Sequence, residues 1–402
     1  MKGPLAGIRV IELAQIMAGP SCGLLLADMG ADVIKVERLP GGDVSRSYSR
    51  PSIGGESAAF MMLNRNKRGI AVNLKSPGGL EVMKRLVATA DVVTENFRKG
   101  TLEKLGLGWD VLQALNPRLV YSVISGFGLT GPDADKGGFD LIAQGFGGLM
   151  SITGMPGGPP VKAGPPLADI NAGILAAMGI SAALHARHAT GRGQLVDTSL
   201  MEAAVQQTYW QSAIYFATGE SPGPTGSAHV LAAPYQAFPT ADGWINVGGA
   251  NQANWERIAK AIGHEDLIDD PRFRTNGDRM KHLDELTPLI AERMRTRTSA
   301  QWIREFEALD IAVGPINSIG QMLAEPQVAA REMVVEVDHP KAGLTKVLGM
   351  PVKFSDTPCA VTRAAPLLGQ HTDEVLRSIG YSGTEIEALR ASGAVECAGG
   401  GE

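Results

Sequence analysis

The chain has 402 residues, 44% of them hydrophobic and 20% charged, and its formal net charge at pH 7 is −5. This composition is typical of a globular protein with about two domains, and the small, unclustered charge argues against a nucleic-acid-binding surface. Three cysteines lie far apart at positions 22, 359 and 397, which excludes a disulfide framework or a zinc spacing and predicts a reducing, cytoplasmic location.

The first 200 residues alternate short β-branched runs with helical segments, beginning with the strand "IRVIELA". Strands are predicted at 8–14, 32–37, 70–74, 91–96, 119–128 and 194–200, and helices at 19–30, 76–90, 109–115 and from about 200 to 217. This alternation predicts parallel βαβ units in a doubly wound α/β sheet, within a large Rossmann-like domain over residues 1–220.

A Gly/Pro/Ser-rich break, "GESPGPTGS" at 219–227, precedes a different pattern. Residues 234–249 predict a hairpin with its turn at Asp242-Gly243, and helices follow at 251–262, 283–296 and 299–309. We therefore predict a smaller α+β domain over 225–325. From about 326 we expect short strands at 333–340 and 345–354, a last helix at 373–379, and a disordered tail, "ECAGGGE".

No export signal or membrane span is predicted. The start, "MKGPLAGIRVIELA", lacks a basic region followed by a long apolar core. No window holds about 18 uninterrupted apolar residues. The apolar stretch 172–184 is too short for a span.

Parallel sheets bind ligands beyond the carboxyl ends of their strands. The segments at these ends are "QIMAGP" (15–20), "RLPGGD" (38–43), "NFRKG" (96–100) and "SGFGLTGP" (125–132). The stretch "MAGPSCG" departs from GxGxxG, so a nicotinamide dinucleotide is not favoured, whereas a phosphate at a helix N-terminus remains open. The basic cluster "NRNKRG" (64–69) indicates either a solvated loop or a phosphate clamp.

One carboxylate, Asp169, lies where "GPPLADINAGILAAMG" (164–179) enters a helix. Asp before a helix is usually a cap, although the capping-box partner is missing because position 172 is Ala. A helix N-terminus also stabilises an ionised carboxylate and lowers its pKa, and carboxylates act as covalent nucleophiles. The residues alone leave both interpretations open.

Other catalytic signatures are missing from the sequence. There is no GxSxG motif and no cysteine with a recognisable histidine signature. His185 and His188 are three apart in a predicted helix, but no acidic or cysteine partner lies nearby, so no metal site is predicted.

Over nearly its whole length the chain resembles the class III CoA-transferases, the family of formyl-CoA:oxalate and carnitine CoA-transferases. The resemblance is carried by segments 7–46, 64–79, 94–108 and 125–154, then by "GPPLADINAG" (164–173), "TGRGQLVDTSLMEA" (190–203), "APYQAF" (233–238) and "PLLGQHT" (366–372). It implies that Asp169 is the nucleophile. Asp169 would attack the donor thioester to form an anhydride and then carry CoA as an aspartyl-CoA thioester, which an incoming carboxylate would resolve.

The resemblance also implies where CoA binds. No cofactor would be bound permanently, because the CoA thioester is itself a substrate, exchanged with a free carboxylic acid. The implied CoA contacts are Gln15, Ile16, Met17, Ala18, Arg38, Val72, Leu74, Asn96, Phe97, Arg98, Thr101, Lys104, Lys136 and Phe139, with Asp140 as an acidic neighbour of the active site. Some family members carry Lys at the position of Ser125.

Further implications concern the smaller domain and the assembly. The segment "GGANQ", with Gly248, Gly249 and Gln252, resembles a mobile loop that covers the intermediate, although Ala250 and Asn251 replace glycines. The segment 226–238 resembles that of transferases acting on dicarboxylates such as succinate, with His229, Tyr235 and Gln236 as candidate partners of a second carboxylate. The family fold is an interlocked, ring-like homodimer in which residues 326–402 return to the large domain.

The main alternative is an acyl-CoA racemase or epimerase, which moves the α-proton of a 2-methylacyl-CoA with two acid/base groups. Related racemases carry His where this chain has Phe139, and a "GDFGGG"-type segment where it has "ADINAG". Both departures favour transfer. A non-enzymatic CoA-binding subunit is disfavoured by the presence of Asp169, and a nicotinamide oxidoreductase by the missing phosphate motif.

Overall fold

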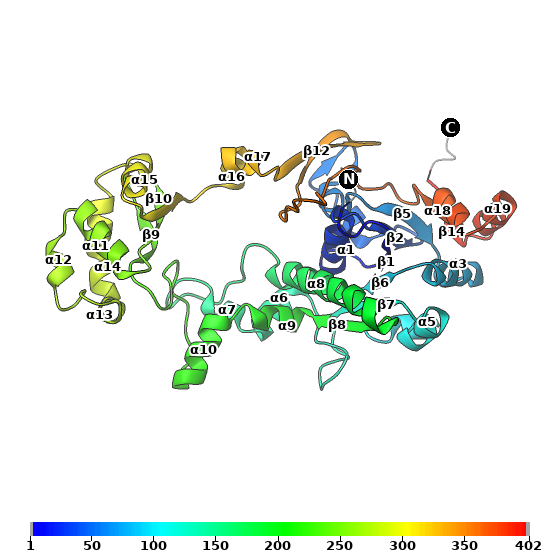
Figure 1. The fold of residues 1–402 in the computed structure, drawn as a ribbon, viewed down its shortest axis with the longest axis horizontal. Coiled ribbons are helices and arrows are strands. Elements are labelled where there is room, and N and C mark those ends of the chain that lie inside the picture. The colour runs from blue at the N-terminus through cyan, green and yellow to red at the C-terminus, as the bar shows by residue number, and fades with distance from the viewer. Residues whose placement is uncertain (1–2, 399–402) are drawn as a thin grey trace. The chain divides into compact units, whose positions relative to one another are not determined.

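The computed structural model describes residues 3–398, which divide into two compact units (Figure 1). The first unit contains the chain up to Leu149, Lys162–Gln207 and the chain from Pro326 onward, and the second contains Met150–Val161 and Thr208–Glu325. Residues 150–161 and 208–220, which the sequence analysis assigned to the large domain, thus belong to the second unit.

A seven-stranded sheet forms the centre of the first unit. Its strands are β1 (Arg9–Leu13), β2 (Asp32–Arg38), β5 (Arg68–Val72), β6 (Val92–Glu95), β7 (Val120–Ser125), β8 (Leu195–Ser199) and β14 (Val395–Glu396), in the spatial order β14-β5-β2-β1-β6-β7-β8. All neighbours are parallel except β14 with β5. Without β14 this is the order of a doubly wound sheet, which reverses between β1 and β6. The expected α/β class with a mainly parallel sheet is therefore confirmed.

Helices cover both faces of this sheet, which explains the near-continuous Val and Ile runs of its strands. The helices of the first unit are α1 (Ala18–Asp28), α2 (Ala58–Asn64), α3 (Pro77–Ala88), α4 (Thr101–Lys104), α5 (Trp109–Leu115), α6 (Asp140–Phe146), α8 (Leu167–Thr190), α9 (Leu200–Gln206), α17 (Pro326–Ala330), α18 (Thr372–Ser378) and α19 (Gly383–Ala391). Short additional elements are η1 (Val44–Ser47), β3 (Ser52–Ile53), β4 (Glu56–Ser57) and the hairpin β12 (Val334–His339) and β13 (Gly343–Leu348), while α7 (Leu149–Ile152) crosses between the units.

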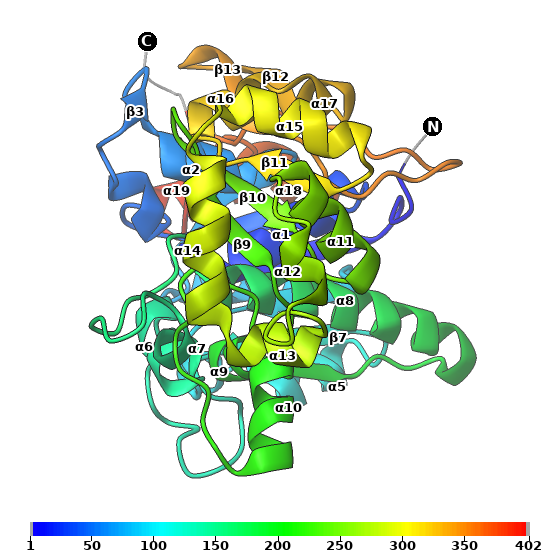
Figure 2. The same cartoon turned by 90° about the vertical axis from the view of Figure 1, so that its left-hand side faces the viewer.

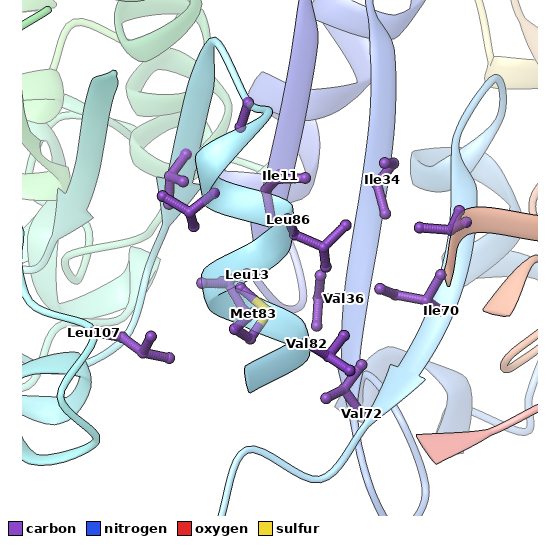
Figure 3. Packing of buried hydrophobic residues seen from close by; sticks show 14 of the residues in the cluster. Ile11, Leu13, Ile34, Val36, Ile70, Val72, Val82, Met83, Leu86 and Leu107 are labelled. Carbon is purple, nitrogen blue, oxygen red and sulfur yellow. The ribbon is translucent and has the colours of Figure 1, made fainter. Parts of the chain in front are cut away.

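Side-chain alternation along the strands separates two differently packed faces. On one face Val82, Met83 and Leu86 of α3 pack against Ile11 and Leu13 of β1 and their neighbours on β2 and β5 (Figure 3). On the other face α1 and α8 lie against the sheet and against each other. Gly173 of α8 permits this close approach, because a Cβ atom there would lie 2.7 Å from the carbonyl oxygen of Ala18.

The second unit is built around a three-stranded antiparallel sheet (Figure 2). Its strands are β9 (Tyr235–Pro239), β10 (Trp244–Gly248) and β11 (Ala312–Pro315), and its helices are α10 (Tyr209–Thr218), α11 (Gln252–Ala261), α12 (Asp266–Asp269), α13 (Asn276–Lys281), α14 (Leu283–Met294), α15 (Ser299–Ala308) and α16 (Ile319–Ala324). Buried Phe238, Trp255, Trp302 and Phe306 belong to one core. The hairpin predicted at 234–249 is confirmed as β9 and β10.

Some elements near the ends of the predicted segments differ from expectation. The helix expected to reach residue 217 ends with α9, Gln207 is its C-cap, and α10 begins separately at Tyr209. Helix α19 was not predicted, although Ser382 and Glu385 form a capping box at its start. Glu396, expected in a disordered tail, is paired with Ala71 in β14, and residues 399–402 of that tail lie outside the described residues.

Helix α8 is 24 residues long and, by length and composition alone, apolar enough to cross a membrane. The prediction that the apolar stretch is too short was therefore wrong. One such helix is weak evidence for a span, because a core helix meets the same criteria. Buried Ala172, Ala176 and Ile180 belong to α8, which packs on α1, α9, β7 and β8 as a core helix does.

Candidate active site

A cavity of about 300 Å³ lies in the first unit at the carboxyl ends of the parallel strands. It is bordered by the segments that follow β1, β6 and β7 and by the start of α8. Because β1 and β6 are the neighbours at which the strand order reverses, the cavity lies where doubly wound sheets bind ligands. Its lining consists of Gln15, Ile16, Met17, Ala18, Asn96, Phe97, Arg98, Lys99, Ile124, Ser125, Gly126, Ala134, Lys136, Gly137, Gly138, Phe139, Asp169 and Leu200.

Most residues that the sequence analysis placed at the CoA site line this cavity together. They are Gln15, Ile16, Met17, Ala18, Asn96, Phe97, Arg98, Lys136, Phe139 and Asp169. The small lining residues Gly126, Ala134 and Gly138 were not singled out as site residues. A signal for the two glycines was present in "SGFGLTGP" and "KGG". A Cβ atom on Gly126 would lie 2.7 Å from Gly138 Cα, and only glycines permit this approach.

Six other predicted residues do not line the cavity: Arg38, Val72, Leu74, Thr101, Lys104 and Asp140. Arg38 is exposed at the end of β2 and its Nε donates to the Gly42 carbonyl at 3.2 Å. Val72 is fully buried in the core and pairs with Val395 of β14. Asp140 lies one residue beyond Phe139 and acts on the site through α8.

The candidate residues for a second carboxylate and a covering loop belong to the second unit. The rings of His229 and Tyr235 stack with centroids 5.0 Å apart and an interplanar angle of 5°. Buried Arg279 donates to Gln252 Oε1 at 3.0 Å and to the Ala233 carbonyl at 2.7 Å. Gly248 ends β10, and at Gly249 a Cβ atom would collide with the Pro234 carbonyl oxygen, so glycine is required there.

Asp169 is the third residue of α8 and does not cap it. The helix begins at Leu167 with Pro166 as its N-cap. The capping acceptor is Asp140, whose Oδ1 accepts from the backbone N–H of Ala168 at 2.9 Å and of Asp169 at 3.5 Å. The cap interpretation of Asp169 was therefore wrong, because a different carboxylate satisfies the first amides of the helix.

Asp140 is itself held in place. Its Oδ2 accepts from Gln144 Nε2 at 2.7 Å, and Gln144 Oε1 accepts from the Ala163 N–H at 2.9 Å. Gln144 is fully buried. This chain of hydrogen bonds links the start of α6 to the segment that leads into α8, and so positions Asp169.

The local environment raises the pKa of Asp169 to about 6 from the ordinary 3.8. Burial is the larger cause, and the negative charge of Asp140 is the second. The expectation that the helix N-terminus lowers this pKa was therefore wrong. At neutral pH the carboxylate is still roughly nine-tenths ionised, and it is more basic than an ordinary aspartate.

Three cations lie along the cavity lining, all with exposed side chains: Arg98, Lys99 and Lys136. Lys99 is 3.8 Å from Asp135, and Lys136 is 2.7 Å from Asp133. No ion pair of Arg98 occurs among residues 3–398, and its guanidinium lies beside Gly137, where a Cβ atom would be 2.6 Å from Nη2. Arg98 can therefore contact an anion without breaking an internal pair.

The basic cluster at 64–69 neither clamps a phosphate nor forms a solvated loop. Its cations are paired internally: Arg65 with Asp28 at 2.5 Å, Lys67 with Glu12 at 2.8 Å and Arg68 with Asp32 at 2.6 Å. Lys67 and Asn64 are fully buried. Both sequence interpretations of the cluster were wrong, because sequence alone does not reveal partners on other strands and helices.

No group of three potential metal-binding His, Cys, Asp or Glu side chains occurs among the described residues. His185 and His188 both lie on α8.

The chain is similar over nearly its full length to known proteins. A family profile described as "CoA-transferase family III" matches residues 5–372. Succinyl-CoA:glutarate CoA-transferase of Mus musculus is 38% identical over 394 residues, covering 98% of this chain and 90% of that protein. Succinate–glutarate CoA-transferase of Agrobacterium fabrum is 41% identical over 384 residues, covering 94% and 96%. The crystal structure of a CAIB/BAIF family protein from Brucella suis is 37% identical and matches with a TM-score of 0.84, covering 94% of this chain and 100% of that chain.

Proposed function

This chain belongs to CoA-transferase family III, and on that premise we propose that it moves CoA from an acyl-CoA thioester to a carboxylic acid through a covalent intermediate on Asp169. The observation that carries the proposal is that Asp169 is the one carboxylate among the side chains lining the cavity. That lining contains no histidine or cysteine, and its one hydroxyl, on Ser125, accepts a hydrogen bond from the Gly128 N–H at 2.8 Å. Asp169 is thus the nucleophile that the site offers.

The proposed reaction has four balanced steps. The Asp169 carboxylate attacks the thioester carbonyl, the carbon–sulfur bond breaks, and a mixed anhydride and CoA thiolate result. The thiolate attacks the aspartyl carbonyl of the anhydride, which releases the first acid and leaves aspartyl-CoA. The acceptor carboxylate attacks this thioester, giving a new anhydride and thiolate. Attack of the thiolate on the new acyl carbonyl then releases the product acyl-CoA and restores the Asp169 carboxylate.

The proposed CoA position follows the same cavity. The thioester end would run along residues 15–18, and the phosphates would face Arg98 and Lys136, which the exposed cations at the lining support. Arg38, Val72, Leu74, Thr101 and Lys104 remain proposed contacts of the adenine and ribose end.

We propose that the exchanged acids are small dicarboxylates such as succinate and glutarate. The names of the mouse and Agrobacterium relatives, which refer to these acids, support this. His229, Tyr235 and Gln236 are proposed partners of the second carboxylate, and residues 248–252 a proposed cover over the intermediate. Because Asn251 Oδ1 accepts from the Asn254 N–H at 2.8 Å as the N-cap of α11, Asn251 has a structural role beyond that of a hinge glycine.

We also propose a cytoplasmic, interlocked homodimer. In the first unit, Phe146 of α6 and Met178 of α8 are 59% and 61% exposed. In the second unit, α10 has no buried residue, and its Trp210 and Phe216 are 59% and 84% exposed. Apolar surface of this kind favours contact with another protein surface. Analytical ultracentrifugation tests the dimer, and a monomer at micromolar concentration would contradict it.

Racemisation fits the cavity less well, because it needs a second acid/base group facing the α-carbon. Apart from Asp169, the titratable groups of the lining are the cations Arg98, Lys99 and Lys136, and Phe139 occupies the position where racemases carry histidine. The presence of a single carboxylate in the lining, Asp169, therefore favours transfer over racemisation.

The test is intact-protein mass spectrometry after mixing with succinyl-CoA, followed by hydroxylamine or borohydride trapping and peptide mapping. We expect an adduct on the Asp169 peptide, and none in Asp169→Asn, which keeps the size of the side chain and loses its charge. Turnover by Asp169→Asn, or an adduct on another residue, would contradict the proposal. Deuterium exchange at the α-carbon of 2-methylacyl-CoA without an adduct would assign the chain to the racemases.

A further inference from the structure

A buried ion network lies against residues 14–20, which comprise the loop after β1 and the first turn of α1 and contribute one wall of the cavity. This segment is here named the cavity loop. The network consists of Glu12 on β1, Lys35 on β2, Asp43 before η1 and Lys67 before β5, each no more than 1% exposed. Lys35 Nζ lies 3.0 Å from Glu12 Oε1 and 2.9 Å from Asp43 Oδ2, and Lys67 Nζ lies 2.8 Å from Glu12 Oε2. Two positive and two negative charges therefore balance.

Three members of the network also bind the backbone of the cavity loop. Lys35 Nζ donates to the Ala14 carbonyl at 2.8 Å, and Lys67 Nζ donates to the Pro20 carbonyl at 2.9 Å. Asp43 Oδ1 accepts from the Ile16 N–H at 3.1 Å. Since Lys67 also donates to Asn64 Oδ1 at 2.9 Å, each ammonium group has three oxygen atoms within 3.0 Å.

The backbone at Ile16 explains why so many contacts converge on it. Its φ is 66°, in the left-handed region that β-branched residues rarely adopt. Asn96 also binds the backbone of the preceding residue, accepting from the Gln15 N–H and donating to the Gln15 carbonyl, each at 2.9 Å. A conformation this unfavourable persists only where its surroundings impose it, and such positions gather at functional sites.

Stability alone gives a poor reason for the network. Removing four charged groups from water is unfavourable, and apolar side chains of similar volume often serve a core equally well. Glu12 and Lys35 lie on the sheet face covered by α1, where apolar residues would pack. The room for Glu12 depends on Gly23 of α1, since a Cβ atom there would overlap Glu12 Oε2.

We propose that Asp43 is a positioning residue, which fixes the Ile16 amide and thereby the wall of the cavity that receives CoA. Lys35 holds Asp43 in place. Glu12, which is paired with Lys67, in turn holds Lys35. Ile16, Met17 and Ala18 line the cavity together with Asp169, and Gly173, one turn beyond Asp169, packs on the Ala18 carbonyl. The network thus fixes the distance between the thioester-binding backbone and the nucleophile's helix. The inference rests on the proposed CoA site.

Two double variants test the contact to Ile16. Lys35→Met with Asp43→Asn and Lys35→Met with Asp43→Leu both remove one positive and one negative charge and leave the Glu12–Lys67 pair. Asn retains an oxygen that accepts from the Ile16 N–H, whereas Leu has a similar volume and no acceptor. Asp43 Oδ1 also accepts from the Ser45 N–H at 2.8 Å and from Ser45 Oγ at 2.7 Å, and the Leu variant loses both contacts. Ser45→Ala is the control for losing the hydroxyl contact.

Three measurements on the full-length protein follow each variant: hydrogen–deuterium exchange of the peptide spanning residues 14–20 without ligand, calorimetric binding of free CoA, and thermal unfolding. In the Leu variant we expect exchange of this peptide and the Kd for CoA both to rise roughly tenfold or more. In Ser45→Ala we expect both to stay within about threefold of the wild type. In the Asn variant, which loses the Lys35 contact to the Ala14 carbonyl but keeps an acceptor for the Ile16 N–H, we expect both to rise clearly less than in the Leu variant.

The outcomes separate this inference from the proposed function. Equal exchange and equal CoA affinity in the two double variants would overturn the positioning role, even if both lose stability. The wild type could also fail to bind CoA while the Leu variant still shows faster exchange of the peptide than the Asn variant. This result would overturn the proposed CoA site and, with it, the functional part of the inference. If the Leu variant does not fold, the wild type still decides, because rapid exchange of the Ile16 amide in the free protein would overturn the proposal.

Discussion

Replacing Asp140 with asparagine should lower the pKa of Asp169 and shift the pH dependence of transfer. The pKa of Asp169 is raised from 3.8 to about 6, first by burial and second by the charge of Asp140, a rise of 6 − 3.8 = 2.2. Because burial is the larger of the two causes, Asp140 accounts for less than about one pH unit. The asparagine side chain would keep an oxygen that accepts from the Ala168 N–H, so the start of α8 is retained.

The assay is kcat/KM for CoA transfer between pH 4.5 and 8. The nucleophile must be ionised, so activity falls as the pH drops through the pKa of Asp169, near pH 6 in the wild type. In Asp140→Asn this acid limb should move to lower pH by up to about one unit. At pH 5 the ionised fraction of Asp169 would then rise up to roughly fivefold.

A matched control is Asp110→Asn, which neutralises an exposed acid on α5 and should leave the limb in place. A limb in Asp140→Asn that stays at the wild-type pH, or moves to higher pH, would refute the electrostatic role of Asp140.

Three further predictions concern the surroundings of the site. Gly173→Ala should lower the free energy of unfolding by about 1–3 kcal/mol in urea denaturation, because the new Cβ atom would lie 2.7 Å from the Ala18 carbonyl oxygen and 2.8 Å from Ser21 Cβ. The control is Gly164→Ala, where the new Cβ atom would meet open space. Equal stability of the two variants would contradict the close packing of α1 and α8. Arg98→Gln should raise KM for the acyl-CoA roughly tenfold with little change in kcat. The control is Arg192→Gln, which changes an exposed residue outside the cavity lining and should leave KM unchanged. A loss confined to kcat would argue against phosphate binding by Arg98. Although burial opposes it, Lys35 and the hydrogen bonds from Ser45 together lower the pKa of Asp43 from 3.8 to about 2. The resulting stabilisation of the folded state, on the order of 2 kcal/mol, is present above pH 4 and lost as the pH falls toward 2. The unfolding free energy should therefore drop more between pH 6 and 3 in the wild type than in Lys35→Met/Asp43→Asn, and equal drops would contradict the ion pair.

The arrangement of the main sheet and the place of its ligand site could be predicted from the sequence because both depend on local patterns. Runs such as "IRVIEL" and "DVIKVE" are buried strands with helices on both faces, and they match β1 and β2 closely. The rule that ligands bind beyond the carboxyl ends of parallel strands then led to the segments 15–20, 38–43, 96–100 and 125–132. Parts of three of them line the cavity, whereas no residue of 38–43 does.

The features that escaped prediction depend on partners distant in the sequence. Asp169 looked like a cap because local propensity favours Asp before a helix, whereas the actual cap, Asp140, comes from another helix. The lysine of the "NRNKRG" cluster has its carboxylate partner, Glu12, on a strand 55 residues earlier (67 − 12). No local pattern distinguishes such a buried ion from a solvated one, because burial is decided by which helix covers the strand.

The use of a carboxylate rather than Ser or Thr to cap α8 has a chemical consequence. Any of these side chains would satisfy the first amides of the helix. A neutral cap would leave burial as the one cause that raises the pKa of Asp169, and the nucleophile would be less basic. An acidic cap adds a repulsion that the Asp169 carboxylate relieves either by binding a proton or by forming a bond to an acyl carbon. At neutral pH, where proton binding is minor, Asp140 therefore favours acylation of Asp169, which is the first step of the proposed transfer.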